Sequence, residues 1–188
     1  MPRDQKAFDD LIEQLSRDDE NLTSINLTNA GLNKRDLDVL ANELAGNTKL
    51  EELDLSSNQL TSEMILPLVS VLEFNPNLKK LTLNDNNFSE DKKDMLVALG
   101  RKSSGLRELS LANCQLSDMV IEKFADKGLS QNQSLSLEVL NLANNFCEQW
   151  GTISLGLMFF NNSNLRLKVL ILSNNLIDRS VMSLCKYI

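Results

Sequence analysis

The sequence predicts an α/β solenoid in which parallel strands line a concave face and α-helices cover the convex face. Two observations carry this prediction: a leucine-spaced phrase that returns six times, and a stripe of apolar residues at helical spacing behind most copies. The phrase is clearest at residues 50–60, with the form L-x-x-L-x-L-x-x-N-x-L. Copies begin near residues 22, 50, 78, 106, 137 and 167, so the steps are 28, 28, 28, 31 and 30.

Each copy of the phrase predicts one short strand and the turn that follows it. Leu53 and Leu55 are two residues apart, which places both side chains on the same face of a strand. Asn58 then stands where the chain must leave the strand. A buried side-chain amide at that point can satisfy loop backbone groups that have no partner in the sheet.

The remainder of each repeat predicts a convex helix, and a repeat near 29 residues leaves room for a true α-helix. In the first repeat the apolar stripe consists of Leu37, Leu40, Ala41 and Leu44. Ser62 and Ser117 each precede an acidic residue and are predicted to be helix N-caps. Gly100 stands where the second repeat has Leu72, so the register of the third helix must slip by one or two residues.

The chain is predicted to divide into an N-terminal capping helix, residues 1–21, and six repeats, residues 22–188. Within residues 4–18, an apolar stripe is formed by Phe8, Leu11, Ile12 and Leu15. A helix with a polar back can cover the open end of the repeat core, although it could instead pack elsewhere. No C-terminal capping unit is evident, and either Met182, Cys185 and Ile188 fold back or the end stays open. We therefore expect a monomer, or a weak dimer through this uncapped end.

Composition and charge exclude two classes of partner. The 188 residues carry 26 acidic and 19 basic side chains, a formal charge of −7. Phosphate neutralisation needs the opposite balance, so we expect no nucleic-acid binding. No apolar run approaches the roughly 18 residues of a membrane span, so we expect no membrane insertion.

Cysteines and glycosylation motifs predict a cytoplasmic protein. The three cysteines are widely spaced and form no disulfide framework, which favours buried thiols in a reducing compartment. Residues 1–6 are not followed by the apolar region of a secretory signal. Asn26 lies in an N-x-S/T motif on a predicted strand, where a glycan would block the concave face. The cytoplasm is that of the producing cell, or of a host cell into which the protein is delivered.

The sequence contains no recognisable catalytic machinery. It has no histidine, which removes the commonest general base and most zinc sites. It also lacks a C-x-x-C pair, a glycine-rich phosphate loop and a G-x-S-x-G elbow. We therefore predict no enzyme activity, no catalytic residue, no cofactor site and no metal site.

The predicted concave face changes character along the stack. Its N-terminal half is polar and charged, through Glu52, Asp54, Lys80 and Glu108. Its C-terminal half is apolar, through Val139, Ala143, Val169 and Ile171. Contiguous exposed apolar surface usually marks a contact site, so we predict that these residues bind a protein partner. Alternatively, the chain end covers the last strands, these strands merely favour β-formers, or a second copy makes contact through the uncapped end.

Trp150, the only tryptophan, is predicted to be a second anchor at the rim of the concave face. The alternative is that it packs under its own loop.

The six copies resemble the ribonuclease-inhibitor-like subclass of leucine-rich-repeat proteins, over residues 22–188. This resemblance implies a horseshoe with strands inside and helices outside. It also implies a non-enzymatic module for protein–protein interaction.

A second resemblance covers about 45 residues at the N-terminus. The helix through Leu11-Ile12-Glu13-Gln14-Leu15, the strand Thr23-Ser24-Ile25-Asn26-Leu27 and the following Leu37-x-x-Leu40-Ala41 are similar to the start of the tropomodulin repeat domain. Tropomodulins cap actin filaments at their pointed ends, so actin is an alternative partner. The sequence lacks the long N-terminal region and the final helix of tropomodulins, and no actin-contact residue can be carried over. Compact repeat proteins of this kind also resemble effectors that some intracellular bacteria deliver into host cells.

Overall fold

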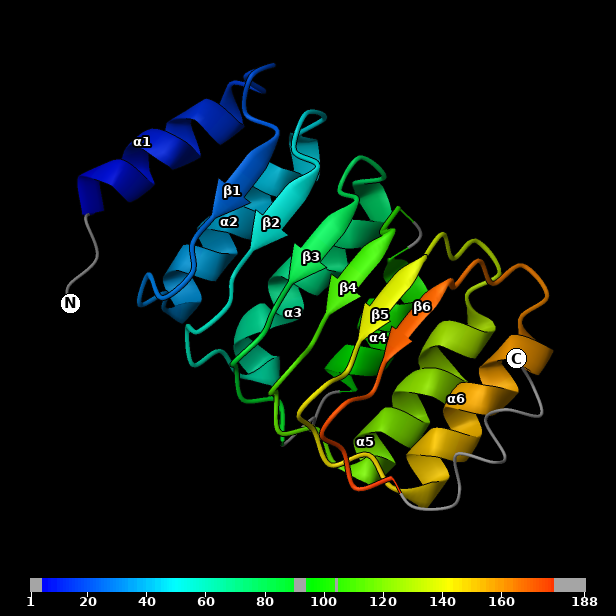
Figure 1. Ribbon diagram of the computed structural model, residues 1–188. Coiled ribbons are helices and arrows are strands. Elements are labelled where there is room, and N and C mark those ends of the chain that lie inside the picture. Colours follow the sequence, from blue (N-terminus) through cyan, green and yellow to red (C-terminus); the bar gives the residue numbers. More distant parts are fainter. Residues whose placement is uncertain (1–4, 90–93, 104, 178–188) are drawn as a thin grey trace.

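The computed structural model describes residues 5–89, 94–103 and 105–177 and confirms the α/β leucine-rich-repeat solenoid. Six parallel strands pair in sequence order to form one open sheet (Figure 1). They are β1 (Ser24–Asn26), β2 (Glu52–Asp54), β3 (Lys80–Thr82), β4 (Glu108–Ser110), β5 (Val139–Asn141) and β6 (Val169–Ile171).

The helices of the repeats lie on one side of this sheet and leave its other face uncovered, and the N-terminal helix lies at the end of the stack (Figure 1). They are α1 (Gln5–Ser16), α2 (Lys34–Gly46), α3 (Ser62–Val71), α4 (Met95–Lys102), α5 (Asp118–Lys123) and α6 (Gln149–Asn161). Packed helices need about 8–10 Å each, whereas paired strands need about 4.8 Å. The stack therefore curves with the strands on its concave side. No helix in the described ranges has the length and apolar character needed to cross a bilayer.

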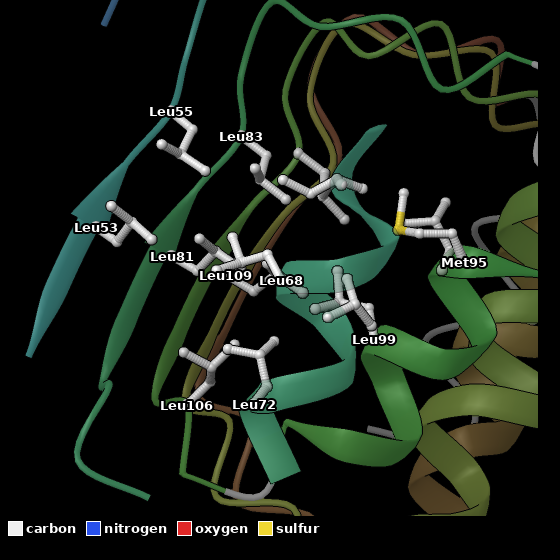
Figure 2. Packing of buried hydrophobic residues seen from close by; sticks show 14 of the residues in the cluster. Leu53, Leu55, Leu68, Leu72, Leu81, Leu83, Met95, Leu99, Leu106 and Leu109 are labelled. Carbon is white, nitrogen blue, oxygen red and sulfur yellow. The ribbon is translucent and has the colours of Figure 1, made fainter. Parts of the chain in front are cut away.

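The core lies between the sheet and the helices, and the central residue of each strand points into it. Leu81 and Leu109 meet Leu68 and Leu72 of the convex side, and Leu99 enters from the next helix (Figure 2). The central residues of β1 to β5 are at most 1% exposed, whereas Leu170 in β6 is only half-buried. The core thus thins at the last strand.

After every strand, the chain turns at a residue in the left-handed backbone conformation. The φ of this residue lies between 53° and 59° at Asn29, Ser57, Asp85, Asn113, Asn144 and Asn174. Asn and Asp adopt this conformation more readily than other non-glycine residues. The N–H of each of the first five donates to a carbonyl of the next repeat, as Asn113 does to Ala143 at 2.9 Å. The turn therefore also joins neighbouring repeats.

A strand-end ladder follows these turns, with buried side chains at Asn58, Asn86, Cys114 and Asn145 and a half-buried one at Asn175. Asn145 shows the pattern, because its Oδ1 accepts from the N–H groups of Cys114 and Leu116, both at 3.0 Å. Its Nδ2 donates to Leu111 O at 2.9 Å and Leu142 O at 3.0 Å. Each ladder asparagine thus satisfies the loop of its own repeat and that of the preceding one.

A helix-end ladder, which the sequence analysis missed, occupies the opposite side of each repeat: Asn47, Asn75, Ser103, Asn132 and Asn162. Nδ2 of Asn162 donates to Leu129 O at 3.0 Å and to Asn132 O at 2.8 Å. Ser103 is too short for this role, and its buried Oγ has no hydrogen-bond partner among the described residues.

The α1 helix attaches to the first repeat through a hydrogen bond from the helix-end ladder. Nδ2 of Asn47 donates to Leu15 O at 3.2 Å, and Thr48 donates to the Asp18 carboxylate through its N–H (2.7 Å) and hydroxyl (2.6 Å). The hydroxyl bond lowers the pKa of Asp18 from its usual value. Phe8 and Leu15 are buried, so the apolar side of α1 covers the end of the core.

Of the two predicted helix N-caps, one is confirmed and one is wrong. Ser117 is the N-cap of α5, and its side chain accepts from Val120 N, as predicted. The prediction for Ser62 is wrong: Thr61 is the N-cap, and Ser62 is the first helical residue, with a buried hydroxyl that has no partner in the described structure.

The predicted register slip in α4 is one residue. Its buried Met95, Leu96 and Leu99 lie 27 residues after Leu68, Val69 and Leu72, instead of 28.

The three extra residues of the fourth repeat are absorbed after α5. The chain continues there as a π-helical segment, η2 (Phe124–Gly128), and a 3₁₀ turn, η3 (Leu129–Gln131). A π turn holds more residues than an α turn, so the longer repeat keeps its place in the stack.

Candidate protein-binding surface

The uncovered face of the sheet presents two rows of side chains that run across all six strands. Strand pairing aligns Ser24, Glu52, Lys80, Glu108, Val139 and Val169 in the first row. It aligns Asn26, Asp54, Thr82, Ser110, Asn141 and Ile171 in the second. Adjacent members of a row are one strand spacing apart, about 4.8 Å. The structure therefore brings the predicted charged and apolar residues onto one surface.

The N-terminal part of this surface is acidic with one basic residue among the acids. Lys80 lies between Glu52 and Glu108, and its Nζ is 3.7 Å from Glu108 Oε2. Asp54 is half-buried and accepts from Ser56 N at 2.9 Å and from Ser56 Oγ at 2.6 Å. These bonds fix the Asp54 carboxylate, whereas the exposed Glu52 is free to reorient.

A hollow of about 370 Å³ crosses the centre of the sheet, from Asp54 and Lys80 to Val139 and Ile171. Its floor is a polar network that the sequence analysis did not single out. Ser110 Oγ donates to Asn84 Oδ1 at 2.7 Å, and Asn141 Nδ2 donates to Ser110 Oγ at 3.0 Å. Ser110 and Asn141 occupy matching positions of neighbouring repeats, whereas Asn84 lies two positions further along its own repeat.

The apolar part of the surface is smaller than predicted. Val169 and Ile171 in β6 are 45% and 36% exposed, and Val139 in β5 is half-buried beside them. Ala143 is only 6% exposed, because it follows β5 and belongs to the turn rather than to the open sheet. The concave apolar patch is therefore Val139, Val169 and Ile171. The Met182, Cys185 and Ile188 of the predicted chain-end contact lie outside the described residues.

Trp150 is 62% exposed and does not pack under its own loop. It lies in the first turn of α6, where its backbone N–H donates to Asp118 Oδ2 at 3.0 Å. Its place is thus the edge where strands pass into helices. Three exposed side chains lie in the loops and first helical turns of the same edge and were missed from the sequence: Met119, Phe146 and Leu176.

A cluster of charges lies at the opposite edge, where strands β4 to β6 begin. Lys168 Nζ is 2.6 Å from Glu138 Oε2, and Arg107 Nη1 is 3.7 Å from Glu138 Oε1. The hydrogen bond from Lys168 lowers the pKa of Glu138. Arg107 and Lys168 are largely solvent-exposed and Glu138 is half-buried, so water screens both ion pairs and the cluster contributes little to stability.

The two described cysteines are buried and free, as predicted. Burial raises the pKa of Cys114 to about 12 and that of Cys147 to about 11. Both thiols are therefore protonated and unreactive at neutral pH. In the described part of the chain, no three His, Cys, Asp or Glu side chains gather as a metal site.

Comparison with known proteins agrees with this architecture. The Leucine Rich Repeat family model matches residues 49–72 and 105–126. A mouse (Mus musculus) protein, "Ribonuclease inhibitor", is 31% identical over 171 residues, which are 88% of this chain and 36% of that protein. The chain therefore spans about a third of the length of this curated relative.

Two solved structures share the fold. The tropomodulin C-terminal domain of Caenorhabditis elegans has a TM-score of 0.64 at 18% identity and covers 83% of this chain and 93% of its own. The actin-binding site 2 of leiomodin-1 has a TM-score of 0.62 at 20% identity and covers 72% of this chain and 78% of its own. Identities this low establish the common fold only.

Proposed function

We propose that this chain, which is a leucine-rich-repeat protein of the ribonuclease-inhibitor-like type, is a non-enzymatic module that holds a protein partner on its concave face. The observation that supports this most is the uncovered sheet, where two rows of polar and charged side chains end in an exposed apolar patch. In this proposal residues 1–21 form the N-terminal cap and residues 22–188 the binding repeats.

The roles of the concave residues follow from their exposure and charge. Val169 and Ile171, with Val139 beside them, lose water when a partner covers them and so supply most of the affinity. Glu52, Asp54, Lys80 and Glu108 orient the partner, because exposed charges affect specificity and association rate more than affinity. The partner fitted to this face carries apolar side chains opposite β5 and β6 and a basic group opposite β2.

The test is capture of partners from eukaryotic cytosol by the wild-type chain and by the double variant Val169→Asp/Ile171→Asp. A partner should bind the wild type and be lost from the variant, because two buried carboxylates would be unpaired in the complex. The matched control is Phe74→Asp/Phe160→Asp, which adds the same charge at two exposed positions on the helices. Circular dichroism must first establish that both variants fold. Equal capture by the wild type and both variants would remove the concave face as the site.

Actin is a second candidate partner, because this fold also carries the leiomodin-1 actin-binding site 2 and a tropomodulin domain. If this chain acts on actin filaments, it should slow the growth of their pointed ends. Elongation of seeds capped at the barbed end measures this directly. Unchanged growth at a large molar excess of the chain would exclude the activity.

Ribonuclease is a third partner to test, on the basis of the relative's name alone. Residual RNA cleavage in the presence of the chain is the readout, and full cleavage at equimolar ratio and above would exclude inhibition.

We place this function in the cytoplasm of the producing cell or of a host cell, because two free thiols are buried in the core.

A further inference from the structure

Four large apolar side chains form a second exposed surface, outside the concave face: Met119, Phe146, Trp150 and Leu176. We call it the edge patch. Each of the four is between 51% and 62% exposed. Phe146 and Leu176 occupy the same position in successive repeats, directly after Asn145 and Asn175 of the strand-end ladder. Leu176 N donates to Cys147 O at 3.0 Å, so the two loops that carry them are in contact.

The other two residues are held together by the Asp118 carboxylate. Asp118 lies in the first turn of α5 and accepts from three N–H groups at the start of α6: Glu148 at 2.7 Å, Trp150 at 3.0 Å and Gly151 at 2.7 Å. Met119 follows Asp118 directly, so these bonds join its helical turn to that of Trp150. A Cβ at Gly151 would lie 2.7 Å from Asp118 Oδ1, so glycine permits this close approach. The backbone beneath the patch is therefore fixed.

The apolar character is local and is not required by the repeat. At the position of Phe146 and Leu176, earlier repeats have Gln59, Asn87 and Gln115. These three residues line a polar hollow of about 380 Å³ on the same edge, together with Asp85. The fold therefore accepts polar residues here, and only the fifth and sixth repeats have large apolar ones at this position. Exposed apolar clusters of this kind mark contact sites.

The charge around the edge patch defines the chemistry of its partner. Within three residues of its members, the described part of the chain has three acidic residues, Asp118, Glu122 and Glu148, and neither lysine nor arginine. Lys123 follows Glu122, and its Nζ lies 3.9 Å from Asp94 Oδ1 of the preceding repeat. The α6 helix carries no charged residue. The described rim of the patch is therefore acidic, and the sequence beyond it continues with one charge of each sign, Asp178 and Arg179.

We propose that the edge patch docks a cationic amphipathic segment of a partner protein, with apolar side chains on the four residues and lysine or arginine beside Glu122 and Glu148. This proposal shares with the proposed function only the premise that the ligand is a protein. The concave apolar patch is a separate surface, and the polar pair formed by Asn174 Nδ2 and Asn144 Oδ1 at 2.8 Å lies in the turns between the two.

The local charge can be tested on the unmodified protein, because Trp150 is its only tryptophan. An exposed indole with an acidic rim should be quenched more strongly by caesium than by iodide, and Glu148→Gln should reduce that preference. Asp126→Asn, which removes an exposed acid distant from Trp150 along the chain, is the control and should leave the preference unchanged. Equal quenching by both ions, or stronger quenching by iodide, would overturn the acidic assignment and with it the choice of partner.

Docking is tested with two synthetic peptides of the same leucine pattern, one with lysine and one with glutamate at the polar positions. The lysine peptide should shift Trp150 emission to the blue in a saturable titration, and the glutamate peptide should not. Anisotropy of a labelled lysine peptide should show affinity reduced roughly thirtyfold by Trp150→Ala, as for a central interface aromatic. Phe160→Ala removes a more exposed aromatic side chain from the other end of α6 and should leave affinity unchanged.

The remaining outcomes separate this proposal from the proposed function. Val169→Asp/Ile171→Asp should leave peptide affinity within a factor of two, or raise it through the added negative charge. Binding lost in that variant and retained in Trp150→Ala would move the site to the concave face and overturn the edge proposal. Equal binding of both peptides would also overturn it. So would a molecular mass that rises with concentration and is restored to that of a monomer by Trp150→Ala, because the occupant would then be a second copy.

Discussion

Asn145 makes five hydrogen bonds inside the protein, and its neighbours in the strand-end ladder repeat most of them. Cys114 is the exception in this column. Its sulfur lies 3.1 Å from Leu83 O but offers no oxygen for the amides of the preceding loop, and there Phe88 N donates to the backbone carbonyl of Cys114 instead. A ladder position can therefore lose its amide when the loop beside it finds another acceptor.

Replacing Asn145 with alanine should lower the free energy of unfolding by about 3 kcal/mol, because buried N–H and C=O groups lose their partners. Urea denaturation followed by circular dichroism measures the change. The control is Asn42→Ala, at an exposed position within α2, which should change stability by less than about 0.5 kcal/mol. Similar effects of the two substitutions would mean that water or a relaxed loop replaces the ladder bonds.

Single residues also explain what the sequence analysis could and could not provide. The spacing of leucines predicted every strand pairing, since a parallel stack allows one register once Leu53 and its counterparts face the core. The left-handed turns and the helix-end ladder were missed, although Asn113 and Asn132 stand in visible columns. Asparagine suits turns, caps and solvent alike, so a column of asparagines does not by itself identify the carbonyls that it bonds.

At the scale of elements, α4 and η2 approach each other closely on the convex side. A Cβ on Gly100 would lie 2.9 Å from both Cα and C of Gly128, closer than side chains allow. This contact explains why the sequence has glycine at position 100, directly after Leu99, the counterpart of Leu72. Backbone approaches of this kind depend on the π-helical course of η2, which no residue pattern predicted.

Gly100→Ala should therefore lower the free energy of unfolding by about 2 kcal/mol through overpacking, although alanine is normally the better helix former. Gly46→Ala is the matched control, because nothing lies within 4 Å of its added Cβ at the end of α2. That variant should be neutral or slightly more stable. Thermal melts of both variants measure the change in stability. A stabilised Gly100→Ala protein would contradict the close contact.

The whole molecule is a one-dimensional stack, in which each repeat contacts mainly its neighbours. For this reason, the positions of some predicted site residues agree with the structure better than those of others. Residues on the strands, such as Lys80 and Ile171, lie where periodicity placed them. Residues that follow the strands, such as Ala143 and Trp150, depend on how each turn leaves the sheet, and their exposure could not be derived from spacing.

Substitutions of matched leucines should measure how stability varies along the stack. Leu81→Ala, at a fully buried position, should cost about 4 kcal/mol, whereas Leu170→Ala, at a half-buried position in the last strand, should cost roughly half as much. Both positions are the central residues of their strands, so local geometry is the same. Chemical denaturation of the two variants gives the comparison, and equal costs would contradict the thinning of the core at β6.

The two ladders have a consequence for how such a chain can change over generations. Each ladder asparagine bonds to carbonyls one repeat earlier, so insertion or loss of a single residue between ladder positions breaks bonds on both sides. Duplication or deletion of a complete repeat leaves every such bond intact with a new neighbour. The length of the binding surface is therefore expected to change by whole repeats during evolution. Smaller insertions are expected to be tolerated only where a segment like η2 can accommodate the extra residues.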